Sequence, residues 1–154
     1  MSSIECFVPS MNGEDISTTV ESFSRSQSFT GVTILSGVSL RSTQTLRSIA
    51  EAVSHKYILI YTKDLPLEMG LFALDRFIAI AEDTKADMLY VDHYEVIDGQ
   101  RKKHPVIDCQ KGALRDDFDF GPIVCVREDL LLQWMQSSGL DNPVRNFYFL
   151  RLFL

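Results

Sequence analysis

The fold is decided by one stretch of the sequence, Tyr57-Ile58-Leu59-Ile60-Tyr61-Thr62-Lys63-Asp64. Its first part is continuously apolar, β-branched or aromatic, which is typical of a buried strand. The strand ends in a charged pair, and Pro66 follows shortly after. Because proline lacks an N–H, it suits the first turn of a helix. We therefore expect a buried strand, a short acidic loop and a helix that begins at Pro66.

The helix expected from Pro66 carries an apolar stripe at helical spacing. The side chains expected to face the core are Leu67, Leu71, Leu74, Phe77, Ile78 and Ala81. A strand that runs into a helix marks the carboxyl edge of an open α/β sheet, where such sheets hold their ligands. Thr62, Lys63 and Asp64 are therefore the first candidates for a functional site.

Two similar strand-helix units come before this one in the sequence. Strands are expected over residues 4–8 and 32–35. Helical stripes follow them, carried by Ile16, Val20 and Phe23 and then by Leu46, Ile49, Ala50 and Val53. This alternation predicts a parallel sheet with right-handed crossovers, so the carboxyl ends of its strands open on one edge. The segments 9–12, 36–37 and 62–64 are expected to meet there.

The pattern changes after the third helix. Residues 88–97 begin as a buried strand and then alternate, and Asp98-Gly99 is a hairpin turn signal. A long polar section, residues 100–121, is expected to place Arg101, Lys102 and Lys103 at a solvated hairpin tip. A strand over 123–126 and a final amphipathic helix follow. The predicted class is α/β, with a mostly parallel central sheet and a hairpin or antiparallel section after the fourth strand.

Composition limits the function. A chain of 154 residues with 45% hydrophobic content is expected to form a single domain, residues 1–154, with its own core. The net charge of −6 argues against a surface that grips nucleic acid, and no apolar run approaches membrane-spanning length. Cys6, Cys109 and Cys125 show no CxxC spacing and are interpreted as structural thiols. Without a signal sequence, the expected location is cytoplasmic.

The last residues, 147–154, are apolar and end without a stop signal. An apolar element of this kind usually has a partner that covers it. We therefore expect either that the chain is part of a longer protein or that it forms an oligomer through this segment.

In the order and spacing of these segments, the chain resembles the family-2, GT-A-type glycosyltransferases, which move a sugar from a nucleotide diphosphate donor to an acceptor. The matching segments are Phe7-Val8-Pro9-Ser10-Met11-Asn12, residues 32–37, 57–64, 86–92 with Asp98-Gly99, and 115–121. The resemblance covers nearly the whole chain. It implies a Rossmann-like GT-A three-layer sandwich, with residues 1–98 as the nucleotide-sugar-binding half and 99–154 as a partial acceptor-side half.

The resemblance also implies site residues. The donor-binding candidates are Pro9, Ser10, Asn12, Glu14, Ser36 and Lys63. Asp64 is the expected ligand of Mg²⁺ or Mn²⁺, the cofactor that would stabilise the leaving diphosphate. Asp116 or Asp117 is the expected general base, because clustered carboxylates raise one another's pKa. The plainer interpretation is a turn aspartate at Asp64 and a solvated acidic loop at Asp116 and Asp117.

Three departures from the family pattern leave two functions open. Ser36 stands where family members carry an aspartate for uracil, Thr62-Lys63-Asp64 replaces Asp-x-Asp, and Asn146-Phe147 replaces a Glu-Asp pair. Lys63 is therefore a candidate for direct contact with the diphosphate. One function is an inverting glycosyltransferase domain that acts on a glycan or lipid-linked glycan acceptor. The alternative is a catalytically degenerate nucleotide-sugar-binding or interaction module of the same fold.

Overall fold

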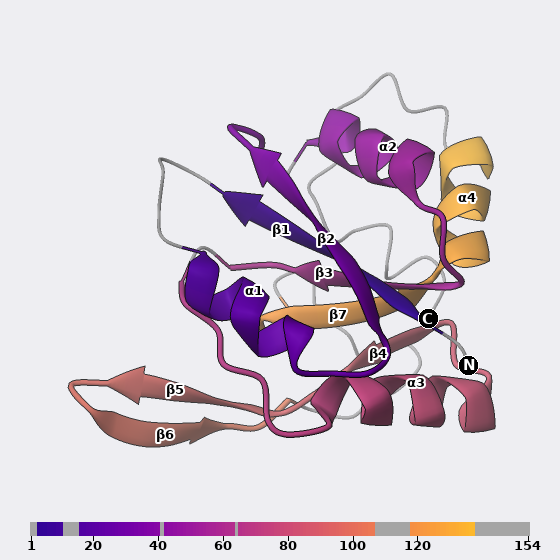
Figure 1. Cartoon of the computed structure of the whole chain (residues 1–154). Helices are drawn as coiled ribbons and strands as arrows, with labels where there is room; N and C mark the ends of the chain where they lie inside the picture. Colours follow the sequence, from indigo (N-terminus) through magenta and orange to yellow (C-terminus); the bar gives the residue numbers. More distant parts are fainter. Residues whose placement is uncertain (1–2, 11–15, 41, 64, 107–117, 138–154) are drawn as a thin grey trace.

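The computed structural model describes residues 3–10, 16–40, 42–63, 65–106 and 118–137. They form a five-stranded sheet with helices on both faces and a separate two-stranded hairpin (Figure 1). The α/β class is as predicted from the alternation of strand and helix patterns.

The sheet is mixed, and its order is β2-β1-β3-β7-β4. Its strands are β1 (Ile4–Ser10), β2 (Phe29–Ser36), β3 (Tyr57–Tyr61), β4 (Met88–Tyr90) and β7 (Ile123–Arg127). β1 pairs in parallel with both β2 and β3. β7 lies between β3 and β4 and is antiparallel to both. The first three strands therefore have the predicted parallel arrangement, and an antiparallel strand separates them from the fourth.

Two apolar clusters cover the two faces of this sheet. Ile58 and Ile60 of β3 face the cluster that includes α2 (Thr43–Ala52) and α4 (Glu128–Ser137). Leu59 faces the cluster that includes α1 (Ser17–Ser24) and α3 (Ala73–Thr84). Because β3 is covered on both faces, all of its residues are buried, which explains its uninterrupted apolar sequence.

The prediction that a helix begins at Pro66 is wrong, because α3 begins at Ala73. Hydroxyl groups of α1 hold the segment before it. The N–H of Leu67 donates to Thr19 Oγ1 at 3.0 Å, and the N–H of Met69 donates to Ser22 Oγ. Residues 67–69 are thus held against α1 as a non-helical segment ahead of α3. Of the stripe expected to be buried, Leu71 is 79% exposed and Leu67 is partly buried, whereas Leu74, Phe77, Ile78 and Ala81 are buried as predicted.

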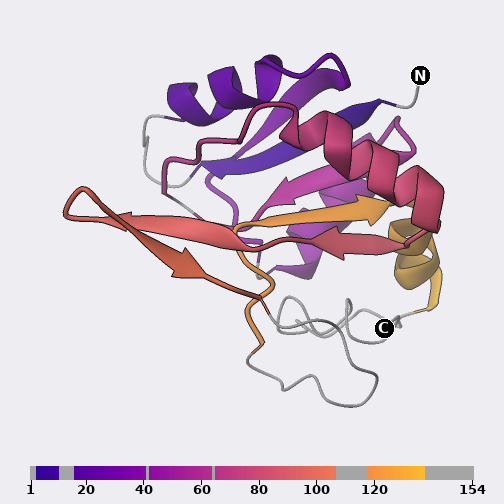
Figure 2. The ribbon, with the colours of Figure 1, turned by 90° about the horizontal axis from the view of Figure 1, so that it is seen from below.

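The hairpin consists of β5 (His93–Ile97) and β6 (Gln100–His104). Its turn is at Asp98-Gly99 as predicted, and both residues have positive φ, 51° and 73°, as a tight hairpin turn requires. The expectation that Arg101, Lys102 and Lys103 form the tip is wrong, because they lie within β6. The hairpin extends away from the sheet and helices (Figures 1 and 2).

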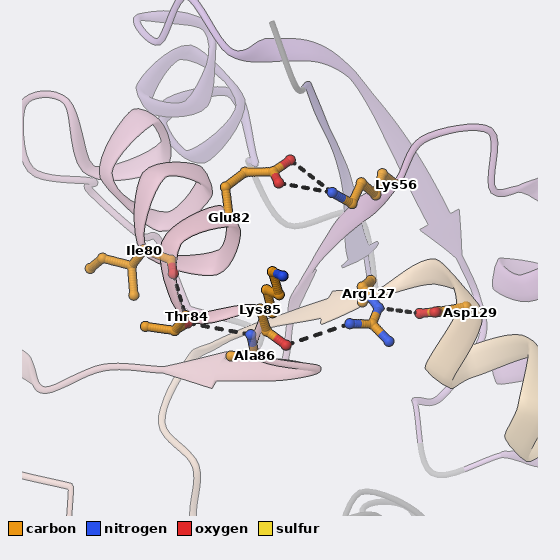
Figure 3. Close-up of polar contacts among 8 residues, drawn as sticks. All are labelled: Lys56, Ile80, Glu82, Thr84, Lys85, Ala86, Arg127 and Asp129. Atoms are coloured by element: carbon orange, nitrogen blue, oxygen red, sulfur yellow. Dashed lines mark hydrogen bonds and ion pairs between the residues drawn. The ribbon is translucent and has the colours of Figure 1, made fainter.

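Charged pairs lie at the edge of the sheet where the parallel strands begin, opposite to their carboxyl ends (Figure 3). Lys56 Nζ lies 2.9 Å from both carboxylate oxygens of Glu82 on α3. Arg127, at the end of β7, donates to Asp129 and to the carbonyl oxygen of Lys85. These contacts attach the end of α3 to the sheet. Other residues occupy the carboxyl ends of the parallel strands, at the opposite edge.

Cys6 and Cys125 are buried free thiols in the sheet. Burial raises the pKa of each to about 12, so both stay protonated and pack as small apolar side chains, as predicted. Cys109 and the apolar segment 147–154 lie outside the described residues. Among the helices that are described, none has the length and apolar character needed to cross a membrane.

Candidate functional site

The carboxyl ends of the parallel strands meet at one edge of the sheet. Ser10, the last residue of β1, is the register partner of Ser36, the last residue of β2. Pro9 pairs in the same register with Leu35. The expected neighbourhood of the segments that contain Pro9, Ser10 and Ser36 is therefore present in the backbone.

Thr62, directly after β3, anchors a segment that comes much later in the sequence. Its N–H donates to the carbonyl oxygen of Pro122 at 2.8 Å, and its Oγ1 donates to the carbonyl oxygen of Gly121 at 2.8 Å. This contact follows from the direction of β7, because the amino end of an antiparallel strand lies beside the carboxyl ends of its neighbours. The residues that precede β7 thus become part of the carboxyl edge.

Lys63 and Asp119 form an ion pair at this edge. Lys63 Nζ lies 2.7 Å from Asp119 Oδ2, and the N–H of Gly121 donates to Asp119 Oδ1 at 2.9 Å. Burial acts to raise the pKa of Asp119, but the Lys63 ammonium and the Gly121 N–H stabilise its charged form and lower the pKa overall. The side chains are 40% and 51% exposed, so solvent and solutes reach both.

Gly121 allows the loop to approach the base of the hairpin closely. Its φ is +85°, and a Cβ at this position would lie 3.2 Å from His93 Nδ1 and 3.4 Å from the carbonyl oxygen of Val91. A side chain would be both conformationally strained and crowded there. Glycine is therefore required for the position that residues 119–122 adopt.

His93 and His104 are direct cross-strand partners at the base of the hairpin. Their ring centroids are 4.6 Å apart, with the ring planes tilted by 31°. The Nδ1 atoms of both are buried and have no hydrogen-bond partner within the described ranges. Burial, and then the neighbouring His104, lower the pKa of His93. The pairing of β5 with β6 brings these two histidines together.

Three aromatic rings attach the loop before β7 to β4. Tyr90 packs edge-on against Phe118 and Phe120, with centroid distances of 6.1 and 5.2 Å, and the two phenylalanines lie 4.8 Å apart. Phe120 is only 4% exposed. This cluster turns Asp119, between the two phenylalanines, toward Lys63 and solvent.

The predicted site residues divide into two groups. Lys63 and Ser36 are described, and the backbones of Pro9 and Ser10 lie at the same edge. The candidates Asn12, Glu14, Asp64, Asp116 and Asp117 lie outside the described residues. Sequence reasoning missed Asp119 and Gly121 as edge residues. The available signal was the Asp-Phe-Gly-Pro run directly before a strand, which reaches this edge only if that strand is antiparallel.

The described residues of this edge present a lysine ammonium group that is paired with a carboxylate. Both oxygens of Asp119 are already engaged, and the described part of the chain contains no group of three or more His, Cys, Asp or Glu residues that would hold a metal. Lys63 offers a partly exposed ammonium group beside the strand ends. No protein-family model and no curated protein matches the chain.

Proposed function

We propose that the chain is a GT-A-type nucleotide-sugar glycosyltransferase domain that transfers a sugar with inversion to a glycan or lipid-linked glycan acceptor. The observation that carries the proposal is the Lys63–Asp119 pair at the carboxyl edge. It joins the end of β3 to residues 118–122, and both belong to segments in which the sequence resembles this family. The proposal therefore rests on two resembling segments that are distant in sequence and adjacent in space.

The topology supports the finer fold assignment within this proposal. Helices cover both faces of the sheet, its first three strands are parallel, and the hairpin follows the fourth strand (Figures 1 and 2). We assign this arrangement to the GT-A three-layer sandwich. Donor binding belongs at the carboxyl edge, where open α/β sheets hold their ligands.

The reaction needs a base and a group that stabilises the leaving diphosphate. The acceptor hydroxyl oxygen bonds to the anomeric carbon while the bond from that carbon to the diphosphate oxygen breaks, and the electron pair leaves with the diphosphate. The hydroxyl proton passes to a carboxylate, for which Asp116 and Asp117 remain the candidates. Lys63 is assigned to the diphosphate, because its ammonium group reaches solvent at this edge.

Asp119 has a different role in this proposal. Its lowered pKa keeps it charged near neutral pH and makes it a weak proton acceptor. It is therefore assigned as a positioning residue that holds Lys63 at the end of β3. A bound diphosphate would compete with Asp119 for the same ammonium group.

A divalent cation held by Asp64 remains part of the proposal, although the described residues do not complete a set of ligands for it. The ion would stabilise negative charge on the diphosphate. The contribution of Lys63 is separable from that of the ion, since a lysine contact does not require added metal.

The alternative, a degenerate nucleotide-sugar-binding module, is favoured by the contacts of Thr62. This residue replaces the first aspartate of the family's Asp-x-Asp, and its hydroxyl group donates to the carbonyl oxygen of Gly121. Thr62 thus serves to hold the loop before β7. Ser36, at the end of β2, likewise replaces the carboxylate that would hold uracil.

Calorimetric titration with UDP, GDP, CDP and dTDP, each with and without Mn²⁺, tests the proposal. We expect one nucleotide to bind, and Lys63→Met to weaken it by about tenfold to a hundredfold, since a hydrogen bond to a charged group is lost. Lys56→Met is the matched control, because Lys56 directly precedes β3, at the end opposite to Lys63, and forms an ion pair with Glu82 there. The proposal fails if no nucleotide binds. Binding without transfer or donor hydrolysis would favour the degenerate module.

A further inference from the structure

The two faces of the β5–β6 hairpin differ in chemistry. Cross-strand partners share a face, and Tyr94 pairs with Lys103 while Val96 pairs with Arg101. One face therefore carries Tyr94, Val96, Arg101 and Lys103, and we call it the cationic face. It combines two apolar side chains with two positive charges and contains no carboxylate.

The side chains of the cationic face are exposed. Tyr94 is 62% exposed and Val96 is 66% exposed, and Arg101 and Lys103 are exposed as well. Within the described part of the chain, neither cation takes part in an ion pair. The hairpin extends beyond the sheet and helices (Figures 1 and 2), so none of the helices or other strands that the structure describes covers this face.

The opposite face has a different composition. Glu95 is paired there with Lys102, so one charge of each sign lies on adjacent strands. His93 and His104 occupy the base of this face and pack against each other. The positive charge of the hairpin is thus uncompensated on one face only, although the whole chain has a net charge of −6.

We infer that the cationic face docks on the surface of an anionic phospholipid membrane. Tyrosine favours the boundary between headgroups and acyl chains, an aliphatic side chain such as Val96 enters it, and lysine and arginine are attracted to anionic lipid. The turn residue Asp98 carries a negative charge, which disfavours insertion of the tip into an anionic surface. The hairpin would therefore lie flat on the membrane. This inference does not depend on the proposed glycosyl transfer.

A nucleic acid fits this face less well. Two cations neutralise few phosphates, and Tyr94 is the one ring that this face offers to a base, whereas single-stranded nucleic acid is held by several stacked rings along a positively charged groove. An acidic protein segment also matches the charge of this face, and the experiment below distinguishes it from a membrane. The charge and the apolar pair together favour the membrane.

Vesicle co-sedimentation of the full chain tests this inference with single substitutions along one strand. We expect binding to vesicles that contain phosphatidylserine, loss of binding at high salt, and no binding to pure phosphatidylcholine. Arg101→Gln and Lys103→Gln should each weaken partitioning about fivefold, the value expected for one cation near an anionic surface. Lys102→Gln removes the same charge from the opposite face and should weaken it clearly less.

A second pair of matched variants tests the apolar contribution to membrane binding. Tyr94→Ser should weaken partitioning, whereas Ile97→Ser, on the opposite face of the same strand, should not. Circular dichroism verifies that every variant remains folded. The inference is overturned if the chain ignores anionic vesicles, if it binds neutral ones equally, or if Lys102→Gln is as damaging as its neighbours. Binding to polyglutamate with none to vesicles would overturn it in favour of an acidic protein partner.

Discussion

Lys63 and Asp119, separated by 56 positions in the sequence, place Nζ and Oδ2 2.7 Å apart at the carboxyl edge of the sheet. Neither residue lies within a strand, and their meeting depends on β3 and β7 being neighbours. The pair is partly exposed, so its charges remain accessible to a ligand. In the proposed function, this position and exposure assign the pair to ligand binding more than to stability.

The first prediction concerns the stability of this pair. Because solvent screens half-exposed charges, Lys63→Met and Asp119→Asn should each change the free energy of unfolding by less than about 1 kcal/mol. A double-mutant cycle measured by urea unfolding should give a coupling of about 0.2–1 kcal/mol. A loss of several kcal/mol in either variant would instead make the pair a structural element.

The second prediction concerns Gly121. Gly121→Ala should destabilise the protein by about 1–3 kcal/mol, because its φ of +85° and the nearby His93 Nδ1 both oppose a Cβ. Gly37→Ala, where φ is +67° but no atom lies within 4 Å of the added Cβ, should show the conformational cost alone. Gly31→Ala, with open space and no positive φ, should be neutral or slightly stabilising. Thermal unfolding gives the order of stability of the three variants. Equal losses of stability at positions 121 and 31 would contradict the prediction.

The third prediction concerns pH. Burial, and then His104, lower the pKa of His93, and Glu95, Asp119 and Lys63 are the other charged groups that act on it. The unfolded chain therefore takes up a proton at this site before the native protein does, as the pH falls below about 6.5. The contribution of His93 to the free energy of unfolding should be zero above this pH and should become destabilising below it.

NMR titration of the histidine ring protons and urea unfolding across this range test the pH prediction. His104→Gln should raise the pKa of His93 and reduce the loss of stability in acid. His55→Gln is the control, because His55 contacts Glu5, away from the hairpin, and should leave the titration of His93 unchanged. A pKa of His93 above 6.5 in the unmodified protein would refute the prediction.

The fourth prediction concerns the buried hydroxyl groups of α1. Thr19→Val and Ser22→Ala should each cost about 1–3 kcal/mol, because the N–H groups of Leu67 and Met69 lose their acceptors. Thr18→Val, at an exposed position of the same helix, should change stability by less than about 0.5 kcal/mol. Chemical unfolding provides the measurement. Equal effects at positions 18 and 19 would show that these N–H groups find water instead.

The predictable parts of the fold are those that local pattern determines. The apolar run of β3 and the stripe of α3 reveal their burial directly, and Asp98-Gly99 specifies the hairpin turn. Thr19 and Ser22 are invisible to such reasoning, because they are polar residues in buried positions. The hydrogen bonds that hold residues 67–69 in a non-helical segment come from another helix, so local pattern does not reveal them either.

The candidate site was only partly predictable for a related reason. Lys63 follows a recognisable strand, so its place at the carboxyl edge could be inferred from local sequence. The place of Asp119 at this edge depends on the direction of β7. The sequence of β7, IVCVR, is equally compatible with a parallel and an antiparallel strand. Pairing between distant strands decides which loops share an edge, and periodicity along the chain does not contain that information.

The position of β7 also sets the order in which the protein can assemble during synthesis. β1 pairs with both β2 and β3, so the parallel half can form once residue 61 has left the ribosome. β4 has β7 as its neighbour in the sheet and must wait for residues 123–127. Because Asp119 and Gly121 arrive with that strand, a nascent chain can acquire the parallel half of its sheet before it acquires the charged edge.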